Sequence, residues 1–458
     1  MLRKDWLRKR AGVMRPPRDP HRAGAAAPPN LGQVLVWTTI LSGTGAGLLW
    51  APHLLWPALH HGFAALFVAL ALWRLAAIGL SRPRPPPPAL PDERLPRYSV
   101  LAPMYREADM VAQCVAALDA LDYPRDRLQV LLVLEADDAA TQAAAAAQPL
   151  PTGFSVFVAP PGEPRTKPRA CNHALAAVTG ELVTIYDAED RPDPQQLRQA
   201  AAAFGSGPPS LACVQAPLRV EVGSDFLSRQ FALEYAALFE VTLPALARLG
   251  LAFPLGGTSN HLHTATLRAL GGWDPYNVTE DADLGFRLAR AGYAATTISA
   301  ATRENAPASL YDWLPQRTRW LKGYMQTLGV QTRAGPPPPS LAAALLLTLG
   351  VTLASALVHL PTASWLAAYL AFWLLGGPGP SLTLLDACAL AGGVGAALLA
   401  NAVGARRAGL RVRSADILLA PLYWPLLTLA FLHAAPRLLL QPHKWDKTDH
   451  SPWPFPAR

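Results

Sequence analysis

Residues 181–190, with the sequence ELVTIYDAED, contain a short apolar run that ends in a cluster of carboxylates. The run Glu181–Tyr186 has the length and composition of a buried β-strand. In the turn that follows, Asp187 and Glu189 lie two residues apart, so both carboxylates can face one divalent cation and leave positions open for phosphate oxygens and water. A solvated acidic turn, or the cap of the helix that follows, explains the same pattern equally well.

Short apolar runs alternate with helical patterns on both sides of this stretch, between residues 97 and 335. The other runs predicted as strands are Tyr98–Ala102, Leu128–Leu134, Phe154–Val158 and Leu211–Ala216. The segments predicted as helices are Glu107–Leu121, Asp138–Gln148, Lys167–Val178 and Pro194–Phe204. This alternation is typical of a parallel α/β sheet, in which ligands bind at the carboxyl ends of the strands. The acidic cluster lies at such an end.

A second acidic pair and a group of cations belong to the same predicted edge. Asp137 and Asp138 follow the second strand, as the first cluster follows the fourth. Arg165, Lys167 and Arg169 surround the start of a predicted helix, where the helix dipole disfavours positive charge. A bound anion such as a nucleotide diphosphate would explain these cations. Ion pairs with the acidic clusters would explain them as well.

Thr279, Glu280 and Asp281 precede a predicted helix over Ala282–Gly292. In one interpretation Thr279 caps this helix and the two carboxylates favour its first turn. In the other, Asp281 projects into the cleft at the sheet edge and acts as a general base.

Gln316, Arg319 and Trp320 lie on one face of a helix predicted over Leu310–Leu328, because they are spaced i, i+3 and i+4. An amide, a guanidinium and an indole on one face suit a phosphate and a sugar ring. The alternative is a basic amphipathic helix that lies on a membrane surface.

Apolar sequence flanks the α/β region. Leu31–Trp50 carries no charge and is long enough to cross a ~30 Å hydrocarbon layer, and Gly62–Leu80 is interrupted only by Arg74. Proline-rich spacers mark the boundaries. The predicted organisation is a basic cytoplasmic arm (1–30), two transmembrane helices (31–80), a proline-rich linker (81–96), an α/β domain with interfacial helices (97–335), three to four transmembrane helices (336–435) and a short cytoplasmic tail (436–458).

The charge distribution supports a membrane topology rather than a nucleic-acid partner. The net charge is +8, and residues 1–34 contribute +6 of it through eight Lys and Arg against two Asp. Positive residues beside a span mark its cytoplasmic side. The four cysteines form no CxxC pair, so neither a disulfide framework nor a zinc site is indicated.

One cluster of arginines leaves the number of later spans open. Arg406, Arg407, Arg411 and Arg413 lie between the last two apolar runs, and the run over 341–375 is broken at His359–Pro361. If that run spans the membrane twice, as a short hairpin, the arginines lie outside. If it spans once, they lie on the cytoplasmic side, as the positive-inside rule expects.

These clusters together resemble the ordered signature of inverting, family-2 membrane glycosyltransferases, and are similar to processive β-glycan synthases such as cellulose and hyaluronan synthases. The matching segments, in order, are the pair Asp137–Asp138, a D-x-D-like turn at Asp187–Asp190, T-E-D at Thr279–Asp281 and Q-x-x-R-W at Gln316–Trp320. Val100–Glu107 resembles the first-strand motif of the group, and Gly256–Ser259 resembles its acceptor-side loop. Glu189 departs from the pattern, since such enzymes usually carry an Asp there.

The resemblance implies a GT-A-type (Rossmann-like) domain inserted between N- and C-terminal transmembrane helices, with a nucleotide-sugar donor, most simply UDP-linked, and Mg²⁺ or Mn²⁺. It implies a catalytic pair, Glu280 and Asp281, in which Asp281 takes the proton of the acceptor hydroxyl. The roles it implies for the other residues are contact with base and ribose (Asp137, Asp138), with the diphosphate (Lys167), with the metal (Asp187, Glu189, Asp190), with the leaving group (Arg319, beside Gln316) and with the acceptor sugar (Trp320).

The resemblance also implies a multi-pass protein of the inner (plasma) membrane with a cytoplasmic catalytic domain, which extends and exports a β-linked polysaccharide, with further export-complex subunits as possible partners. A non-processive transferase that adds one sugar to a lipid carrier is the nearest alternative. An inactive scaffold of an export complex is a more distant one, because none of the key acids is missing.

Overall fold

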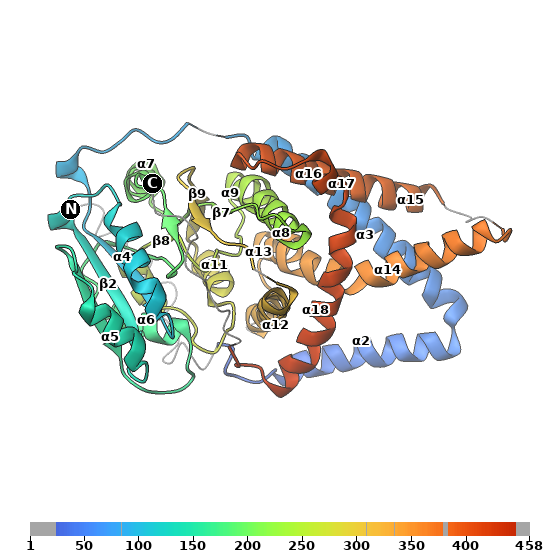
Figure 1. Cartoon of the computed structure of the whole chain (residues 1–458). Helices are drawn as coiled ribbons and strands as arrows, with labels where there is room; N and C mark the ends of the chain where they lie inside the picture. Colours follow the sequence, from blue (N-terminus) through green and yellow to red (C-terminus); the bar gives the residue numbers. More distant parts are fainter. Residues whose placement is uncertain (1–23, 84, 308, 334, 379–382, 446–458) are drawn as a thin grey trace.

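The computed structural model describes residues 24–83, 85–307, 309–333, 335–378 and 383–445. An α/β domain forms one end of the molecule, and long helices from both flanks of the chain extend from it side by side (Figure 1). Most of the predicted basic arm and about half of the predicted tail, residues 1–23 and 446–458, lie outside the described residues.

In the described chain, seven strands form the main sheet in the order β3-β2-β1-β4-β8-β6-β9. The strands are β1 (Tyr98–Met104), β2 (Leu128–Glu135), β3 (Phe154–Ala159), β4 (Leu182–Ile185), β6 (Leu211–Gln215), β8 (Asn260–His263) and β9 (Ala294–Thr297). The five predicted strands are all present. The sheet is parallel except for β8, which runs antiparallel to β4 and β6.

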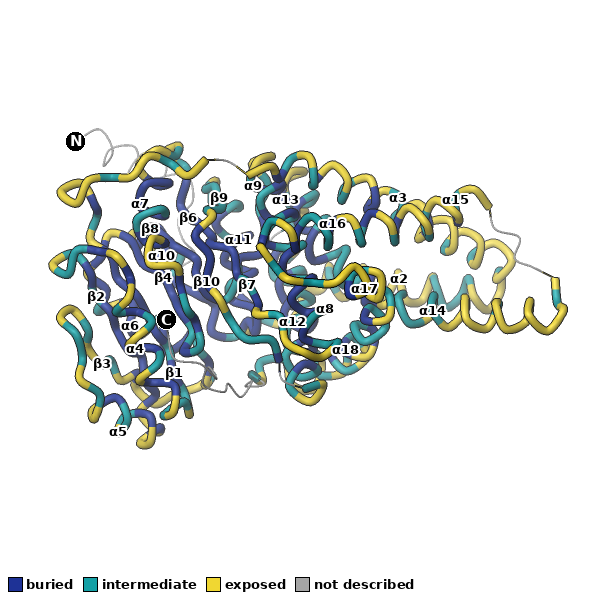
Figure 2. Tube along the Cα trace, turned by 45° about the horizontal axis from the view of Figure 1, so that its top comes forward, coloured by how far each residue is buried: buried dark blue, intermediate teal, exposed yellow. Residues whose placement is uncertain are grey.

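Helices cover both faces of this sheet, which explains why its inner strands β1, β2, β4 and β6 are largely apolar and buried. On β1, Val100 packs with helices α4 (Val111–Asp119) and α7 (Gln196–Ser206), whereas its neighbour Leu101 packs on the other face with α6 (Lys167–Leu175) and α8 (Phe226–Ala237). Figure 2 shows the inner strands as the buried centre of the domain, whereas the edge strands β3 and β9 are partly exposed.

A second, small sheet lies beside the acidic turn. It consists of β5 (Arg191–Pro192), β10 (Thr302–Glu304) and β7 (Leu218–Val220), in the order β5-β10-β7. Because β5 starts directly after Asp190, this sheet places β10 against the turn that follows β4.

The remaining elements of the α/β domain are short, except for the helix that ends it. They are η1 (Asp92–Arg94), η2 (Ala108–Met110), η3 (Arg125–Arg127), α5 (Ala139–Ala147), η4 (Leu238–Thr242), α9 (Leu243–Arg248), α10 (Thr264–Ala269), α11 (Glu280–Arg290) and α12 (Leu310–Arg333).

The flanking helices form pairs that run out from the domain and back (Figure 1). They are α2 (Leu31–Trp50), α3 (Pro52–Leu80), α13 (Pro339–Leu345), η5 (Leu346–Gly350), α14 (Val351–Leu374), α15 (Leu384–Ala387), η6 (Cys388–Gly392), α16 (Gly393–Ala408), α17 (Ser414–Leu418) and α18 (Ala420–Leu440). Among the described helices, three stretches are long and apolar enough to cross a membrane: Pro52–Leu80, Pro339–Leu374 and Leu384–Ala408.

The predicted break at His359–Pro361 is absent, because α14 continues through Pro361. The Thr428 hydroxyl on α18 donates to the Ala356 carbonyl at 2.5 Å and accepts from the Leu360 amide at 3.0 Å. In an uninterrupted helix the Leu360 amide would donate directly to the Ala356 carbonyl. Here the Thr428 hydroxyl lies between these two groups and makes a hydrogen bond to each, next to Pro361.

Arg407, in the last turn of α16, lies at the end of the helices that faces the α/β domain. Arg407 Nη1 donates to Ser81 Oγ at 2.7 Å and to the Glu240 carbonyl at 3.0 Å. The end of α16 is therefore beside the end of α3. This is the arrangement expected if residues 341–375 pass outward once rather than twice.

Candidate functional site

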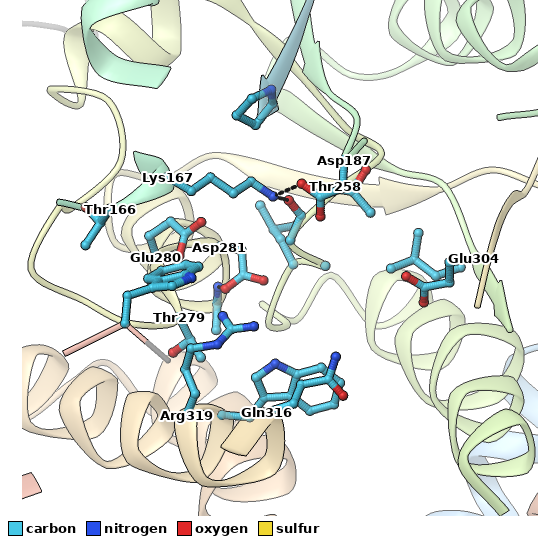
Figure 3. A pocket seen from close by; sticks show the side chains of 18 of the residues that line it. Thr166, Lys167, Asp187, Thr258, Thr279, Glu280, Asp281, Glu304, Gln316 and Arg319 are labelled. Atoms are coloured by element: carbon cyan, nitrogen blue, oxygen red, sulfur yellow. Dashed lines mark hydrogen bonds and ion pairs between the residues drawn. The ribbon is translucent and has the colours of Figure 1, made fainter. Parts of the chain in front are cut away.

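A pocket of about 300 Å³ lies at the carboxyl ends of β1, β2 and β4, between the sheet edge and helix α12. Figure 3 shows that side chains from the turn after β4, the start of α6, the start of α11 and the face of α12 converge on it. Eight of the predicted site residues line it: Lys167, Asp187, Glu189, Glu280, Asp281, Gln316, Arg319 and Trp320. The expected position at the carboxyl ends of the strands is thus where the cavity is found.

The acidic turn after β4 is held by hydrogen bonds from behind. Asp190 is buried and accepts from the Asp187 amide at 2.7 Å and from the Thr258 hydroxyl. Burial raises the pKa of Asp190 well above its ordinary value, and the neighbouring Asp187 and Glu189 carboxylates raise it further. Asp190 therefore shapes the turn, while Asp187 and Glu189 face the pocket.

Lys167 connects this turn to the loop before β8. Its Nζ donates to Asp187 Oδ1 and, at 2.8 Å, to the Gly257 carbonyl. Burial alone would lower the pKa of Lys167, but the carboxylates of Asp187 and Glu280 outweigh that effect and raise it above its ordinary value. The side chain is therefore a permanent cation in the pocket.

The acidic turn suits a divalent cation of the Mg²⁺ or Mn²⁺ type. Mg²⁺ is usually bound through one or two carboxylates together with substrate phosphates and water, so a full cage of protein ligands is not required. Among the described residues, no group of three His, Cys, Asp or Glu side chains forms such a cage. Asp187 presents a carboxylate that is 28% exposed to the pocket, and Asp190 Oδ1 is buried without a hydrogen-bond partner in the described chain. Hard oxygen donors with unused capacity at this turn fit the ion.

Glu280 and Asp281 begin α11 and are both part of the pocket wall. Asp281 Oδ1 accepts from the Ala282 amide at 2.8 Å, while Oδ2 faces Gly257, where an added Cβ would lie 3.2 Å from it. The predicted cap from Thr279 is wrong, because its hydroxyl donates to Asn277 Oδ1 and makes no capping hydrogen bond to the helix. Asp281 instead binds a backbone amide of the first turn with one oxygen, while its other oxygen points into the cavity. Burial and the charge of Asp281 raise the pKa of Glu280 to about 8, and burial raises that of Asp281.

Helix α12 presents Gln316, Arg319 and Trp320 to the pocket, as their spacing predicts. The Arg319 guanidinium lies over the ring of Trp445, 4.5 Å from its centroid. Trp445 belongs to the segment after α18, which Lys322 holds through the carbonyls of Gln441 and Lys444 at 3.0 and 2.8 Å. A part of the chain far from the motifs in sequence thus completes the pocket.

Arg317, between these residues, points away from the pocket. It makes a two-pronged ion pair with Glu234 at 2.8 and 2.7 Å, and its guanidinium lies 4.5 Å from the centroid of the Trp320 ring. The Tyr423 hydroxyl donates to the same Glu234 carboxylate at 2.9 Å. Arg317 therefore joins α12 to α8 and α18 and supports the indole from below.

The acids after β2 lie beside the pocket and do not line it. Asp138 is buried and caps α5 through the Thr141 amide at 3.2 Å, and Asp137 pairs with Arg165 at 2.7 Å. Arg169 pairs with Glu135 at 2.8 Å. The three cations around the start of α6 (Arg165, Lys167 and Arg169) thus all form ion pairs with acidic residues at the sheet edge. Of the two explanations for these cations, the structure supports ion pairs with the acidic residues.

Two pocket residues that carry no motif were missed by sequence reasoning: Glu304 and Trp445. Glu304 comes from β10 of the small sheet, and Figure 3 shows its carboxylate across the pocket from Asp281. Burial raises the pKa of Glu304 well above its ordinary value, and the charges of Asp190 and Glu189 raise it further. A lone Glu on a three-residue strand gives no signal in the sequence.

A second and larger cavity, of about 1040 Å³, adjoins the first among the flanking helices. Tyr235, Trp320 and Tyr324 line both cavities, so the indole stands at their junction. Apart from a few charged and polar side chains, the larger cavity is lined by apolar and aromatic residues of α3, α14, α16 and α18. The larger cavity therefore adjoins the pocket that contains Asp281 on the side of the flanking helices.

Two family models match the chain. The one described as glycosyl transferase family 2 matches residues 99–257, from β1 to the loop of Gly257. The one described as glycosyl transferase family group 2 matches residues 182–399, which include the acidic turn, α11 and α12.

Curated relatives are distant. The chain is 26% identical over 306 residues to a beta-monoglucosyldiacylglycerol synthase of Synechocystis sp., a match that covers 64% of this chain and 59% of the relative. It is 26% identical over 252 residues to the cellulose synthase 1 catalytic subunit (UDP-forming) of Komagataeibacter xylinus, which covers 54% of this chain and 33% of that protein. The chain thus spans no more than about three fifths of the length of these curated relatives.

A solved structure shares the fold. The chain is similar, with a TM-score of 0.54 and 24% identity, to a mannosyltransferase from Pyrobaculum calidifontis solved in complex with GDP-Man and Mn²⁺. The match covers 82% of this chain and 98% of that one. The predicted GT-A-type α/β fold between apolar helices is confirmed.

Proposed function

We propose that the chain contains a glycosyltransferase domain of family 2, as its matches to two family models support, and that it transfers a sugar from a nucleotide-sugar, most simply a UDP-hexose, to a growing β-linked polysaccharide. The observation that carries the proposal is the meeting of Lys167, Asp187 and Asp281 around Gly257. A cation for the diphosphate, a carboxylate for a metal and a carboxylate for the acceptor are the parts that this reaction needs, and they come from distant parts of the chain.

In the proposed reaction, Lys167 and Arg319 bind the diphosphate of the donor and Trp320 stacks on the acceptor sugar. Asp281 accepts the proton of the acceptor hydroxyl while the oxygen attacks the anomeric carbon. The bond from that carbon to the diphosphate breaks, and its electron pair leaves with the nucleoside diphosphate. A single displacement inverts the anomeric centre, so an α-linked donor gives a β-glycosidic bond.

Asp187 and Glu189, with Asp190 behind them, would hold a Mg²⁺ or Mn²⁺ ion, which supplies neutralisation of the charge on the departing diphosphate. Asp137 and Asp138 stay proposed contacts of the base and ribose. Their position beside the pocket, at the end of β2, supports this role, because the base extends farther from the reacting carbon than the phosphates do.

Membrane association supports a polymer product. In the part of the chain that the structure describes, three helices are long and apolar enough to span a membrane, and the larger cavity among them begins at Trp320. Aromatic side chains along such a cavity suit the apolar faces of sugar rings. We propose a multi-pass protein of the inner membrane whose catalytic domain lies on the cytoplasmic side, with Arg407 and its neighbours as the positive residues of that side. The larger cavity is then the way by which the product leaves.

Transfer of a single sugar to a lipid carrier is the second candidate. The apolar part of the larger cavity favours it, because acyl chains suit such a lining. The similarity to a beta-monoglucosyldiacylglycerol synthase points in the same direction.

A donor screen tests the proposal. Purified protein in lipid vesicles is incubated with UDP-glucose, UDP-N-acetylglucosamine, UDP-galactose and GDP-mannose in the presence of Mg²⁺ or Mn²⁺, and the released nucleoside diphosphate is measured. Release from one donor, together with a labelled product of many sugar units, is the expected result. A product of one sugar extractable into organic solvent supports the second candidate, and absence of release from every donor contradicts both.

A further inference from the structure

The wall of the pocket contains two buried side-chain oxygen atoms, one on β10 and one on α12, that have no hydrogen-bond partner in the described chain. Glu304 Oε1 and Gln316 Oε1 are shielded from solvent and have no hydrogen-bond partner among the described residues. Both side chains line the pocket. Buried polar groups are nearly always hydrogen-bonded in folded proteins, so a pair of such acceptors on one wall indicates that a ligand supplies the donors.

Glu304 is held firmly at this wall. Its backbone carbonyl accepts from the Glu221 amide at 2.9 Å, and β10 pairs with the strand that follows the acidic turn. Figure 3 shows its carboxylate pointing into the space between Asp187 and Gln316, opposite Asp281. Tyr235, which lines both cavities, is close enough for the charge of Glu304 to contribute to its raised pKa. Glu304 therefore lies at the side from which an acceptor enters.

The chemistry of this wall excludes the anionic part of the donor. The carboxyl oxygen of Glu304 and the amide oxygen of Gln316 are hydrogen-bond acceptors, and a diphosphate offers only acceptor oxygens, so the two do not complement each other. Hydroxyl groups are the complementary donors. A sugar ring stacked on Trp320 offers several hydroxyls around its edge, so one can be directed to Asp281 while its neighbours reach Glu304 and Gln316. A simple lipid alcohol such as diacylglycerol has only one hydroxyl, which leaves both oxygens unsatisfied once it is directed to Asp281.

We propose that Glu304 is an acceptor-binding residue that makes the enzyme selective for a carbohydrate acceptor: its carboxyl oxygen and the Gln316 amide oxygen accept hydrogen bonds from ring hydroxyls that flank the attacking one. The inference rests on the proposed glycosyl transfer and specifies its acceptor as the terminal sugar of a polymer or of a glycolipid, rather than a bare lipid alcohol.

The experiment compares transfer to a sugar with transfer to water. Wild type, Glu304→Leu and Glu304→Gln are assayed in vesicles with the donor that releases diphosphate in the screen. The acceptors are the n-octyl β-glycosides of glucose, mannose, galactose and N-acetylglucosamine, and separately dioleoylglycerol. Glu304→Leu is expected to lower kcat/KM for the glycoside about 10- to 100-fold, because it removes a hydrogen bond to a buried carboxyl group. Glu304→Gln, which keeps an acceptor oxygen, retains more of the activity.

Hydrolysis of the donor in the absence of an acceptor, and the KM for the donor, should stay within about threefold of wild type, because water does not need the hydrogen bond to Glu304. A loss that arose only from poor folding would lower both reactions together. Glu221→Gln is the matched control: it is a carboxylate on the neighbouring segment that pairs with Arg303 at 3.3 Å outside the pocket, and its transfer rates should equal those of wild type.

Three results overturn the inference and are distinguishable. If wild type glycosylates dioleoylglycerol and none of the glycosides, the acceptor is a lipid alcohol. Glycosyl transfer then stands in the form of the second candidate, without the role of Glu304. If Glu304→Leu loses hydrolysis and transfer equally while its thermal unfolding is unchanged, Glu304 serves the donor. If wild type releases no diphosphate from any donor, the proposed function itself fails.

Discussion

Lys167 and Asp187 form a partly buried ion pair that joins the start of α6 to the turn after β4. The same ammonium donates to the carbonyl of Gly257 at 2.8 Å, and Gly257 faces the free oxygen of Asp281. One lysine thus fixes the distance between the carboxylate proposed for the metal and the carboxylate proposed for the acceptor. Replacement of Lys167 should therefore weaken the binding of the nucleotide-sugar donor.

Replacement of Lys167 with Met should raise the KM for the nucleotide-sugar at least about tenfold, with a smaller change in kcat, because it removes the charged hydrogen-bond donor nearest the acidic turn. Steady-state release of nucleoside diphosphate measures both constants. Arg198→Met is the control, since Arg198 pairs with Asp92 at 2.7 Å on the surface. An unchanged KM in Lys167→Met would show that the diphosphate binds elsewhere.

Asp281→Asn should lower kcat by about 10²- to 10⁴-fold, because the amide cannot accept the proton of the acceptor hydroxyl. The affinity for the donor should stay within about threefold of the wild-type value, because the amide keeps the size of the side chain. Calorimetric titration with the donor nucleotide and a turnover assay separate the two effects. Asp283→Asn, two residues further along α11, should behave in the opposite way. Asp283 is fully buried and pairs with Arg287 at 2.7 Å, so its replacement should lower the melting temperature and spare residual turnover in the folded fraction. Persistent turnover in Asp281→Asn would disprove its assignment as the base.

The strands that carry the site could be predicted from the sequence because each is a continuous apolar run with a polar end. β8 and β9 escaped prediction, since Asn260–His263 and Ala294–Thr297 are short and contain no apolar run. Their strand structure comes from the ladder they join. The break expected at Pro361 also failed for a tertiary reason, because the Thr428 hydroxyl on another helix satisfies the interrupted backbone.

Within the site, the helical spacing of Gln316, Arg319 and Trp320 was sufficient to predict their shared face. Local spacing could not predict Glu304 or Trp445, which reach the pocket through the small sheet and through the segment after α18. Those placements depend on contacts between residues far apart in the chain, and no periodicity records them.

The acid limb of the pH–rate profile should lie above the ordinary range of carboxyl groups. Asp281 must be ionised to accept a proton, and burial raises the pKa of both members of the Glu280–Asp281 pair, that of Glu280 to about 8. The rate should therefore rise with pH as the pair loses its last proton. Glu280→Gln removes a negatively charged neighbour, so Asp281 should ionise at lower pH. The acid limb of the pH–rate profile should therefore shift to lower pH. Measurement of kcat/KM from pH 5 to 9 in both proteins checks this, and a limb that moves up in the variant would contradict it.

Removal of divalent cations with EDTA should stop the reaction, and Mn²⁺ or Mg²⁺ should restore it. Asp187→Asn should raise the metal concentration needed for half-maximal rate at least about tenfold, because its carboxylate is the one of the turn that is 28% exposed to the pocket. Asp126→Asn, with a carboxylate that is 81% exposed on the surface, is the control. Full activity in EDTA would contradict a metal at this turn.

Gly257→Ala tests the spacing between the two carboxylates without removing a charge. The added methyl carbon would lie 3.2 Å from Asp281 Oδ2 and 4.0 Å from Lys167 Nζ, so the Asp281 carboxylate must move by a few tenths of an ångström. A small displacement of a general base strongly lowers the rate of the chemical step, so kcat should fall about 10- to 100-fold. The melting temperature should stay within a few degrees of the wild-type value. Gly329→Ala on α12, where an added Cβ meets no atom of the described chain within 4 Å, should keep full activity and gain stability from its better helix propensity. If Gly257→Ala turns over as fast as Gly329→Ala, the position of Asp281 relative to Lys167 does not govern the rate, and the base must be sought among the other carboxylates of the pocket.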